Sequence, residues 1–501
     1  MKGDFTRNTF DPAKHFSRVL MQQGRVTLDA DFNEQAAILL DYMRTLAKDL
    51  IGPYAAPSAY AGFRLTFDAA TKDLIIGDGR YYVDGILVEN DEPVPYSLQP
   101  DFPLLAADPL AAELKAPKGT VFWAYLDVWE RHVTYIEDDE IREKALNGPD
   151  TCTRAKVVWQ VKALPAASLP QPNITPAGAN LASCSAPLGG LMAVSRALMA
   201  ARIKPGGVFK DACVTPPDSK YRGTENQLYR VEIHQSGAAG TATFKWSREN
   251  GSVASAWLGT SGNDLKVSRS TGFAAGNWVE LIDDTQELMG LPGALVLLTK
   301  VEGNKLTVDP TTASPATATT WTETLVNPRV RRWDQTENDV IHLAGGAVPL
   351  TEKTASADAW IPIEDEIQIQ FSPNGQYRSG DYWLIPARVS TGSIEWPPLT
   401  DANGLPVVVD GVTQPDPLPP DGVEHHYAPL GFLSLTGTTL SLGSCRCTFD
   451  PASSCFRGGS LPVGAHLVKP FNFDARLLSE EAVEESKAEA VLRKRKKPGT
   501  A

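Results

Sequence analysis

The stretch GRYYVDGILVE, residues 79–89, determines the fold class expected for this chain. Its β-prone runs Arg80–Val83 and Ile86–Glu89 flank Asp84-Gly85. An Asp-Gly pair favours a two-residue hairpin, because both turn positions require a positive φ that these residues tolerate. Further short runs rich in β-branched and aromatic residues occur at Asp73–Ile76, Thr120–Trp129, Ala155–Val161, Leu228–His234, Ala242–Trp246, Trp278–Ile282, Val296–Val308, Ile367–Phe371 and Asp381–Arg388. We therefore predict a mainly β protein with a multi-module, β-sandwich-like or β-barrel-like architecture.

The composition agrees with this fold class and limits the partners. The 501 residues include 40 Gly and 38 Pro, a share above average that indicates many turns. A chain of this length is expected to form about three domains. With 47 Lys+Arg against 60 Asp+Glu, the formal net charge is −13. This acidic balance argues against nucleic acid as a partner, because phosphate binding needs a basic surface.

A long amphipathic helix is expected near the N-terminus. Asp31 to Glu34 have the side chains of a capping box, and Gly52-Pro53 ends the helix because proline cannot continue the hydrogen-bond ladder. Between them an apolar stripe has helical spacing and consists of Ala36, Leu39, Leu40, Met43, Ala47 and Leu50. Such a stripe must be buried somewhere. Either it packs on the chain's own first β domain, or it holds the base of an arm, Met1–Leu28, that reaches a neighbouring subunit.

Three proline-rich segments, Pro165–Pro187, Pro310–Pro328 and Pro397–Pro420, predict joints between modules. We expect an N-terminal arm and helix at 1–52, a β domain at 53–164, a Pro-rich linker at 165–187, a central β-rich domain at 188–327, a C-terminal β-rich domain at 328–470 and a charged tail at 471–501. Within the tail, Ser479 can cap a helix that is acidic at its start and basic at its end, which suits the helix dipole. Residues 479–501 form either a solvated tail or a docking segment.

Candidates for catalytic chemistry are few. The motifs G-x-x-x-x-G-K-[ST], H-E-x-x-H and G-x-S-x-G do not occur in the sequence. The acidic clusters Glu137–Glu140 and Glu364–Glu366 indicate solvated loops, because a catalytic carboxylate pair must face each other across a cleft. Asp29–Asn33 imitates the start of a calcium loop, but Glu34 replaces the required glycine, so helix capping is favoured.

One group of residues has the chemistry of a metal site. His425 and His426 precede Cys445, Cys447 and Cys455, and imidazole and thiolate are zinc ligands. Adjacent histidines in a strand point to opposite faces, however, and C-x-C is not the usual zinc-knuckle spacing. The sequence leaves open whether these residues bind a metal, and it favours a cysteine pair of low reactivity. We assign no catalytic, cofactor-binding or metal-binding residue and expect neither a cofactor nor enzymatic activity.

Five tryptophans in β-prone runs are expected to fill cores, namely Trp123, Trp129, Trp159, Trp246 and Trp383. The start of the chain lacks the apolar segment of a secretory signal, and no apolar run reaches the roughly 18 residues that span a bilayer. The sequence therefore predicts a cytoplasmic protein.

Seven segments together carry a family resemblance: MKGDFTR (1–7), SRVLMQQGRV (17–26), LDADFNEQ (28–35), GRYYVDG (79–85), ENQLYRVEIH (225–234), FKWSRENGS (244–252) and GDYWLIPAR (380–388). On these segments the chain resembles an uncharacterised family of domains of unknown function encoded with phage-tail-like contractile injection systems. The resemblance covers Met1 to about Gly431. The second and third segments also look like the start of some phage tail and baseplate proteins.

The resemblance implies a structural subunit of such a particle, at the baseplate or its periphery, and it transfers no catalytic motif. Its partners would be other subunits of the particle, and contact with a membrane or a cell-surface glycan would come through the particle. The protein would be incorporated in the cytoplasm into a particle that is released or membrane-anchored. Two alternatives stay open: a carbohydrate-binding or adhesion module, which needs exposed aromatics on one sheet face, and a glycan-cleaving enzyme, which needs a carboxylate pair facing a cleft.

Overall fold

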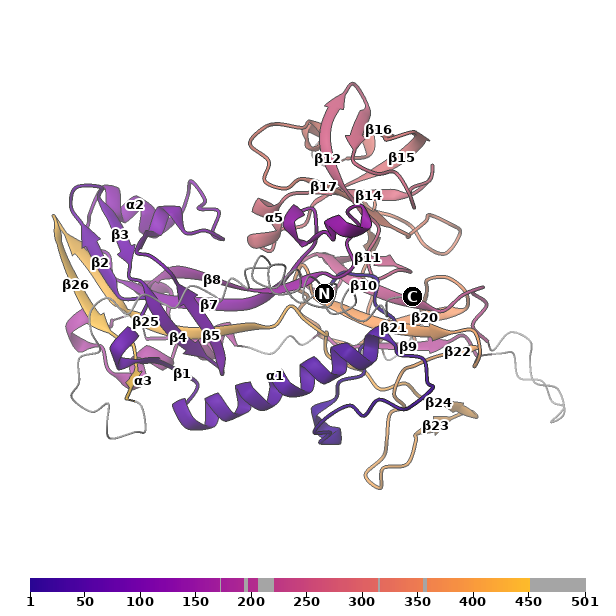
Figure 1. Ribbon diagram of the computed structural model, residues 1–501, viewed down its shortest axis with the longest axis horizontal. Helices are drawn as coiled ribbons and strands as arrows, with labels where there is room; N and C mark the ends of the chain where they lie inside the picture. The colour runs from indigo at the N-terminus through magenta and orange to yellow at the C-terminus, as the bar shows by residue number, and fades with distance from the viewer. Residues whose placement is uncertain (172, 193–196, 206–219, 314–315, 355–357, 451–501) are drawn as a thin grey trace, which may run out of the picture. The chain divides into compact units, whose positions relative to one another are not determined.

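The computed structural model describes residues 1–171, 173–192, 197–205, 220–313, 316–354 and 358–450. The described residues form 27 strands and five α-helices, which confirms the mainly β fold class. Residues Met1–Phe449 form one compact unit. Its sheets make three assemblies, which we call the sheet body, the sandwich and the barrel (Figure 1).

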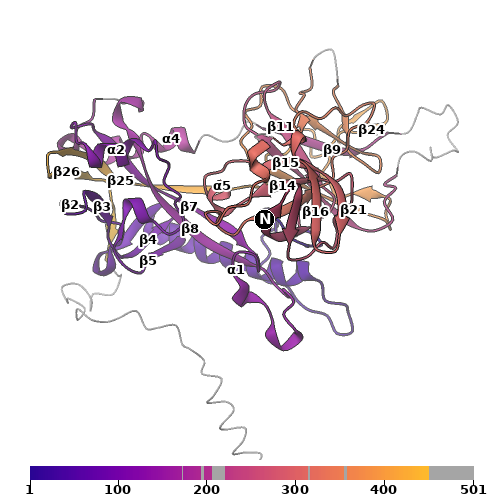
Figure 2. The ribbon, with the colours of Figure 1, turned by 90° about the horizontal axis from the view of Figure 1, so that it is seen from above.

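The sheet body is built on one antiparallel sheet with long central strands, which run side by side in Figure 2. Its order is β26 (Thr439–Ser444), β25 (His425–Thr436), β7 (Phe122–Val133) and β8 (Arg154–Pro165). Two smaller sheets join it, with the orders β27 (Thr448–Phe449), β1 (Tyr54–Pro57), β4 (Gly79–Val83), β5 (Ile86–Asn90), and β2 (Leu65–Asp68), β3 (Asp73–Ile76), β6 (Val94–Pro95). Together with α2 (Pro109–Lys115) they share one core, in which Ile76, Val88 and Leu126 are completely buried.

The hairpin predicted at Asp84-Gly85 joins β4 to β5. Val83 pairs with Ile86, and both turn residues have positive φ, 49° at Asp84 and 83° at Gly85. Glycine is needed at position 85 for a second reason, since a Cβ there would collide with the carbonyl oxygen of Arg44. The turn therefore allows the backbone of α1 (Asp29–Ile51) to approach the sheet body closely.

The sandwich consists of two facing sheets with a common core that includes Phe244, Phe371 and Trp383. The sheets have the orders β18 (Val348–Pro349), β11 (Thr243–Ser247), β10 (Gln227–Gln235), β21 (Tyr382–Arg388), β22 (Ser393–Ile394), and β19 (Ile361–Pro362), β20 (Ile367–Phe371), β9 (Met199–Ile203). A two-stranded ribbon, β23 (Val408–Val409) and β24 (Val412–Thr413), lies in the loop that follows them.

The barrel is closed by six strands and has its own apolar core around Leu265, Val296 and Val330. Its order is β12 (Ala254–Ser261), β13 (Asp264–Val267), β16 (Lys305–Asp309), β15 (Ala294–Glu302), β14 (Trp278–Ile282) and β17 (Arg329–Trp333). The barrel segment is inserted between sandwich strands β11 and β18. The remaining short helices are α3 (Leu181–Ser185), α4 (Leu188–Leu191) and α5 (Asp284–Leu288).

The predicted N-terminal helix is present as α1 and begins two residues before the expected cap. The Asp31 carboxylate accepts the backbone N–H of Leu28 at 3.0 Å, which satisfies a donor just before the first turn. Gly52 ends the helix with φ 91°, and its N–H donates to the carbonyl oxygen of Lys48 at 2.8 Å.

The assemblies do not follow the linear order of the predicted domains. Strand β25 pairs with β7 from His425 opposite Trp129 to Leu433 opposite Phe122, so C-terminal residues complete the first sheet. The segment 165–187, expected to be a linker, packs against the sheet body, and Cys184 within it forms a disulfide with Cys445. Apolar residues between its prolines provide this packing. The tail at 471–501, with Ser479, lies outside the described residues.

Candidate functional site

The outer face of α1 is apolar and is not covered by the described residues. Figure 1 shows the helix along the lower edge of the sheet body. Of 29 large apolar side chains exposed in the described structure, 12 lie between Phe16 and Leu50. This concentration makes a patch, whereas single exposed apolar residues elsewhere are ordinary. The helical part of the patch, called the α1 patch below, consists of Phe32, Leu39, Leu40, Tyr42, Met43, Leu46 and Leu50.

The opposite face of α1 contacts the sheet body through small and charged side chains. Ala30 and Ile38 are the two residues of α1 that are fully buried. Arg44 forms an ion pair with Glu130 at 2.9 Å, and Lys48 forms one with Asp84 at 2.9 Å. The interpretation that the apolar stripe packs on the first β domain is therefore wrong, because the charged face takes that place.

The α1 patch has the spacing of a coiled-coil seam. Phe32, Ala36, Leu39, Met43, Leu46 and Leu50 follow one another at alternating intervals of four and three residues. All six are exposed. An apolar 3-4 repeat over three heptads places its side chains on one narrow face of a helix, and that face normally packs against another helix or chain.

The segment Pro12–Leu28, called the arm below, continues the apolar surface. Its exposed apolar side chains are Phe16, Leu20, Met21, Val26 and Leu28. Polar contacts hold the chain around it beside the first turns of α1: the N–H of Val19 donates to Gln35 Oε1 at 2.8 Å, and Thr9 Oγ1 donates to Glu34 Oε2 at 2.5 Å. The arm reaches the beginning of α1, and the patch from Leu39 to Leu50 stays open.

The first residues belong to the chain's own interior. The carbonyl oxygen of Met1 accepts from Asn250 Nδ2 at 3.1 Å, and Lys2 Nζ lies 3.2 Å from Glu232 Oε1. The hypothesis that all of Met1–Leu28 reaches a neighbouring subunit therefore needs correction: these contacts anchor its beginning internally, and Pro12–Leu28 is the part that is exposed.

A second candidate is a cavity of about 1260 Å³ bordered by the sheet body, the sandwich and the barrel, with apolar and charged residues in its lining. Its wall carries buried ion pairs: Lys245 Nζ lies 2.5 Å from Glu280 Oε1 and 3.3 Å from Glu232 Oε1. Arg230 Nε donates to Glu232 Oε2 at 2.6 Å, and Trp333 Nε1 donates to Glu280 Oε2 at 2.9 Å. The acidic groups on this part of the wall are thus already paired.

These contacts determine the protonation of the cavity wall. Burial alone would raise the pKa of Glu280, but Lys245 and Lys2 outweigh it and hold that pKa at about 2. For Glu232, Lys2, Arg230 and Lys245 likewise outweigh burial and hold the pKa well below its usual value. Burial lowers the pKa of His132 to about 3 and that of His234 to about 4, so both imidazoles are neutral near pH 7. At neutral pH these four side chains therefore do not exchange protons readily.

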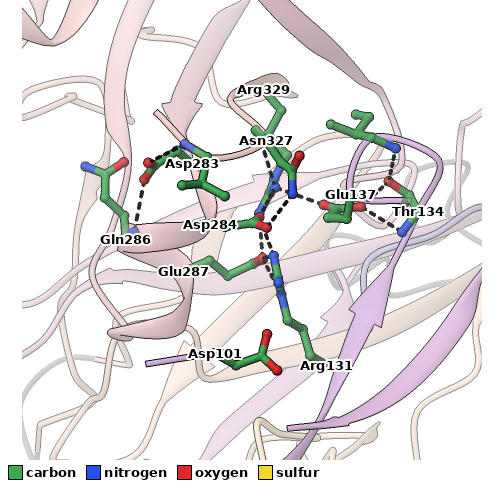
Figure 3. A network of polar contacts seen from close by, with 12 residues as sticks. Asp101, Arg131, Thr134, Glu137, Asp283, Asp284, Gln286, Glu287, Asn327 and Arg329 are labelled. Atoms are coloured by element: carbon green, nitrogen blue, oxygen red, sulfur yellow. Dashed lines mark hydrogen bonds and ion pairs between the residues drawn. The ribbon is translucent and has the colours of Figure 1, made fainter. Parts of the chain in front are cut away.

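A further buried network borders the same cavity (Figure 3). Arg131 from β7 and Arg329 from β17 approach the carboxylates of Asp284 and Glu287 from opposite sides. Arg131 Nη2 lies 2.9 Å from Glu287 Oε2, and Arg329 Nη1 lies 2.8 Å from both Asp284 Oδ1 and Glu137 Oε1. The network links the sheet body to the barrel.

Glu137, Asp284 and Glu287 could in principle hold a metal ion, since one oxygen of each lies within 4.8 Å of the others. Two guanidinium groups already neutralise these oxygens, and Asn327 Nδ2 donates to Asp284 Oδ2 at 2.8 Å. A cation would have to displace both arginines. The donor set therefore fits an ion-pair junction and not a metal site.

The acidic clusters differ from the expected solvated loops. Asp138–Glu140 are exposed as predicted, but the Glu137 side chain is 7 % exposed and belongs to the network above. Glu364 is half-buried, and burial raises its pKa to about 6 against the opposing effect of Arg248, whose Nη2 is 2.9 Å away. The sequence prediction missed these partners because they come from distant strands.

The described members of the suspected metal group do not come together. His425 Nδ1 lies 2.7 Å from Asp127 Oδ1, and His426 Nδ1 lies 3.1 Å from Asp84 Oδ2, so the two rings have separate carboxylate partners. Cys445 is in the disulfide and Cys447 is a free thiol, while Cys455 lies outside the described residues. The five strand tryptophans, Trp123, Trp129, Trp159, Trp246 and Trp383, are all buried, which confirms their expected place in cores.

The fold and these surfaces define a multi-module β protein with a buried ionic junction and an exposed apolar helix. The model of a family of unknown function, DUF6519, matches residues 1–173 and 192–461, and the chain therefore belongs to this family. Neither a curated protein nor a solved structure matches the chain. Within the described ranges, no helix combines the length and the apolar character needed to cross a membrane.

Proposed function

We propose that this chain is a structural subunit of a phage-tail-like contractile injection system, at the baseplate or its periphery. The particle assignment comes from the sequence resemblance described above. The observation that supports an assembly role is the uncovered α1 patch. We further propose that the protein enters the particle in the cytoplasm and that its partners are other subunits.

The energetics of the patch support a binding role. Full burial of one leucine is worth roughly 1.5–3 kcal/mol, so several seam residues together provide a substantial part of a stable interface. Soluble monomers rarely leave a contiguous apolar surface of this kind open to water. The helix is presented on the sheet body by Gly85, Arg44 and Lys48, and its apolar side is the one left for a partner.

The ion pairs of the cavity support a structural role for this part of its wall. Its carboxylates Glu232, Glu280 and Glu287 are bound by lysine or arginine side chains, and such pairing makes these three unsuited to be the free acid or base that hydrolysis of a glycan requires. A carbohydrate-binding role has weak support from the tryptophans, because the five in the strands are buried.

The test compares purified particles with the isolated chain. In a producing strain, wild-type protein should sediment with the particle at fixed stoichiometry, measured by quantitative mass spectrometry. The double variant Leu39→Glu/Leu46→Glu should remain folded and lose at least about tenfold in particle occupancy, because it places two charges in the seam. Leu405→Glu, at another exposed leucine, is the matched control and should be retained.

Three results would contradict the proposal. Wild-type protein that is absent from particles would exclude a subunit role. Release of reducing sugar by the isolated chain, abolished by one carboxylate substitution, would favour the glycan-cleaving alternative. Retention on a glycan array without particle association would favour the adhesion module.

A further inference from the structure

We infer that the α1 patch is covered by the arm of a second copy of this chain. This inference rests on the proposed assembly role and names one partner within it. The occupant is specific: the apolar residues of Pro12–Leu28 in one copy pack along Leu39–Leu50 of another.

The two surfaces have opposite charge. Between Pro12 and Leu28 the arm contains Lys14, Arg18 and Arg25 and no acidic residue. On α1, the cations Arg44 and Lys48 are paired with the sheet body, and the acidic residue Asp49 lies directly beside the last seam residue, Leu50. Arg18, Arg25 and Asp49 are exposed and form no ion pair with another described residue. Opposite charges at the edges of an apolar seam favour one partner and orientation.

The area is large enough for a stable complex. The arm and the α1 patch together expose 12 large apolar side chains. At ~100 Å² for each side chain this surface is on the order of 1,000 Å², near the ~800 Å² per partner of a standard interface. When each copy contributes both its arm and its patch, the interface uses this whole area on each partner, whereas a single arm on a single helix uses about half of it.

The arm does not cover its own helix. The hydrogen bonds from Val19 to Gln35 and from Thr9 to Glu34 place it beside the first turns of α1. The chain then turns at Gly24, which has φ 70°, and returns to the start of the helix at Asp29. The seam beyond Leu39 is therefore left for an arm from outside. Reciprocal exchange gives a two-fold dimer, and one-directional exchange gives a ring or a filament.

Sedimentation of the full-length chain tests this inference directly. Wild-type protein at about 1–50 µM should self-associate with a concentration-dependent mass. The helix variant Leu39→Glu/Leu46→Glu and the arm variant Leu20→Glu/Met21→Glu should each raise the dissociation constant at least about thirtyfold, because each buries charge in the interface. All four positions are exposed in the single chain, so both variants should fold, and Leu405→Glu should leave the mass unchanged.

Mixing the two variants identifies the occupant. The helix variant keeps a normal arm, and the arm variant keeps a normal helix, so an equimolar mixture should form mixed complexes that neither variant forms alone. Arg18→Glu/Arg25→Glu should weaken association about tenfold, and Asp49→Arg should restore most of it. Failure of the mixture to associate would overturn the arm-to-helix contact.

A wild-type protein that stays monomeric over this range would also overturn the inference. Particle occupancy separates this failure from that of the proposed function. A monomeric chain that still enters particles through the α1 patch leaves the subunit role standing and excludes the second copy. A chain that self-associates as described but is absent from every particle supports the contact and excludes the subunit role.

Discussion

The α1 patch and the ionic junction reverse the usual distribution of residue types. On α1, Leu50 and Met43 are 77 % and 64 % exposed. In the two ion-pair networks that border the cavity, Arg329 and Lys245 are 1 % and 2 % exposed, and they lie among carboxylates from different elements of the fold. The chain thus exposes an apolar seam with heptad spacing and buries a network of charged side chains.

The difference separates two kinds of interface. The junction is made within one chain, where ion pairs fix the geometry between the sheet body, the sandwich and the barrel but add little net stability, because desolvation offsets their attraction. Burial of the α1 patch would stabilise a contact through the hydrophobic effect, which is non-directional and grows with the apolar area removed from water. Such a contribution suits contact with a separate molecule. Substitutions in one region should therefore affect folding, and those in the other should affect association.

The largest effect is expected at Arg329. Arg329→Met removes the guanidinium that contacts Glu137, Asp284 and Glu287. It leaves the buried Glu137 carboxylate without this cation, and Asp284 and Glu287 then share Arg131 alone. Breaking a buried ion pair by removing one partner costs about 3–5 kcal/mol. Urea unfolding at 25 °C should show a loss of this size in the free energy of unfolding.

Lys300→Met is the matched control for Arg329→Met. Lys300 pairs with Glu302 at 2.7 Å, but both side chains are more than half exposed. An exposed pair contributes about 0.2–1 kcal/mol, so this variant should differ little from wild type. Equal losses in the two variants would contradict a special role for the junction.

A comparison of two leucines gives the next largest effect. Leu126→Ala, in the core of the sheet body, should cost about 3 kcal/mol because it leaves a cavity among packed neighbours. Leu39→Ala, in the α1 patch, should change the stability of the single chain by less than about 0.5 kcal/mol, because Leu39 is exposed and alanine favours helix. Both are measured by urea unfolding at a protein concentration where the chain is monomeric. A comparable loss at Leu39 would show that the patch is covered within the chain.

The free energy of unfolding should fall as the pH is lowered from 7 to 5, because two buried histidines resist protonation in the folded protein. The pKa of His132 and that of His234 lie at about 3 and about 4 in the folded protein, below the ordinary 6.5, so the unfolded chain binds more protons as the pH falls below 6.5. The stability that these two neutral histidines contribute is fully present above pH 6.5 and is lost progressively as the pH falls toward 4. Glu364, with its pKa raised to about 6, opposes the loss between pH 6 and 4.5. The buried N-terminal amine of Met1, with its pKa lowered to about 4, adds to the loss, so stability should fall by at least about 2 kcal/mol from pH 7 to pH 5.

A second decline should follow below pH 4.5. There the carboxylates of Glu280 and Glu232, whose pKa values are held low in the folded state, lose the stability that they contribute at higher pH. His234→Gln should reduce the first decline by more than about 1 kcal/mol, whereas His342→Asn, at an exposed histidine, should leave it unchanged. A flat profile between pH 7 and 5 would contradict this assignment.

The sequence predicts local features of this molecule and misses those made by distant residues. The Asp84-Gly85 turn and α1 depend on neighbours in the chain, and both are found. The burial of Arg329 and Arg331 could not be predicted, since alternation in β17 turns them away from the barrel core and only a different assembly covers them. The disulfide between Cys184 and Cys445 joins residues 261 positions apart, which spacing does not reveal.

The candidate site shows the same limit. The stripe on α1 could be found from helical spacing, but its direction depends on which face the sheet body takes. The charged face of α1 contacts the sheet body because Glu130 and Asp84 lie opposite Arg44 and Lys48. The strict 3-4 spacing from Phe32 to Leu50 indicates a seam for another helix or chain. Such a seam forms a narrower apolar stripe than that of an ordinary core helix.

The smallest effect is expected where the two regions meet, at the ion pairs that hold α1. Arg44 and Glu130 are each more than a quarter exposed, and Lys48 is half exposed, so Arg44→Gln/Lys48→Gln should lower the free energy of unfolding by less than about 1 kcal/mol. The effect should be local instead. Because α1 buries only Ala30 and Ile38 against the chain, these pairs hold a large share of its attachment, and amide hydrogen exchange in Leu39–Ile51 should rise severalfold while β7 stays protected. Exchange in the self-associated protein should be slower over the same residues if a second arm covers them. Equal exchange in wild type and variant would show that the ion pairs do not hold the helix, and the backbone contact at Gly85 would then have to do so.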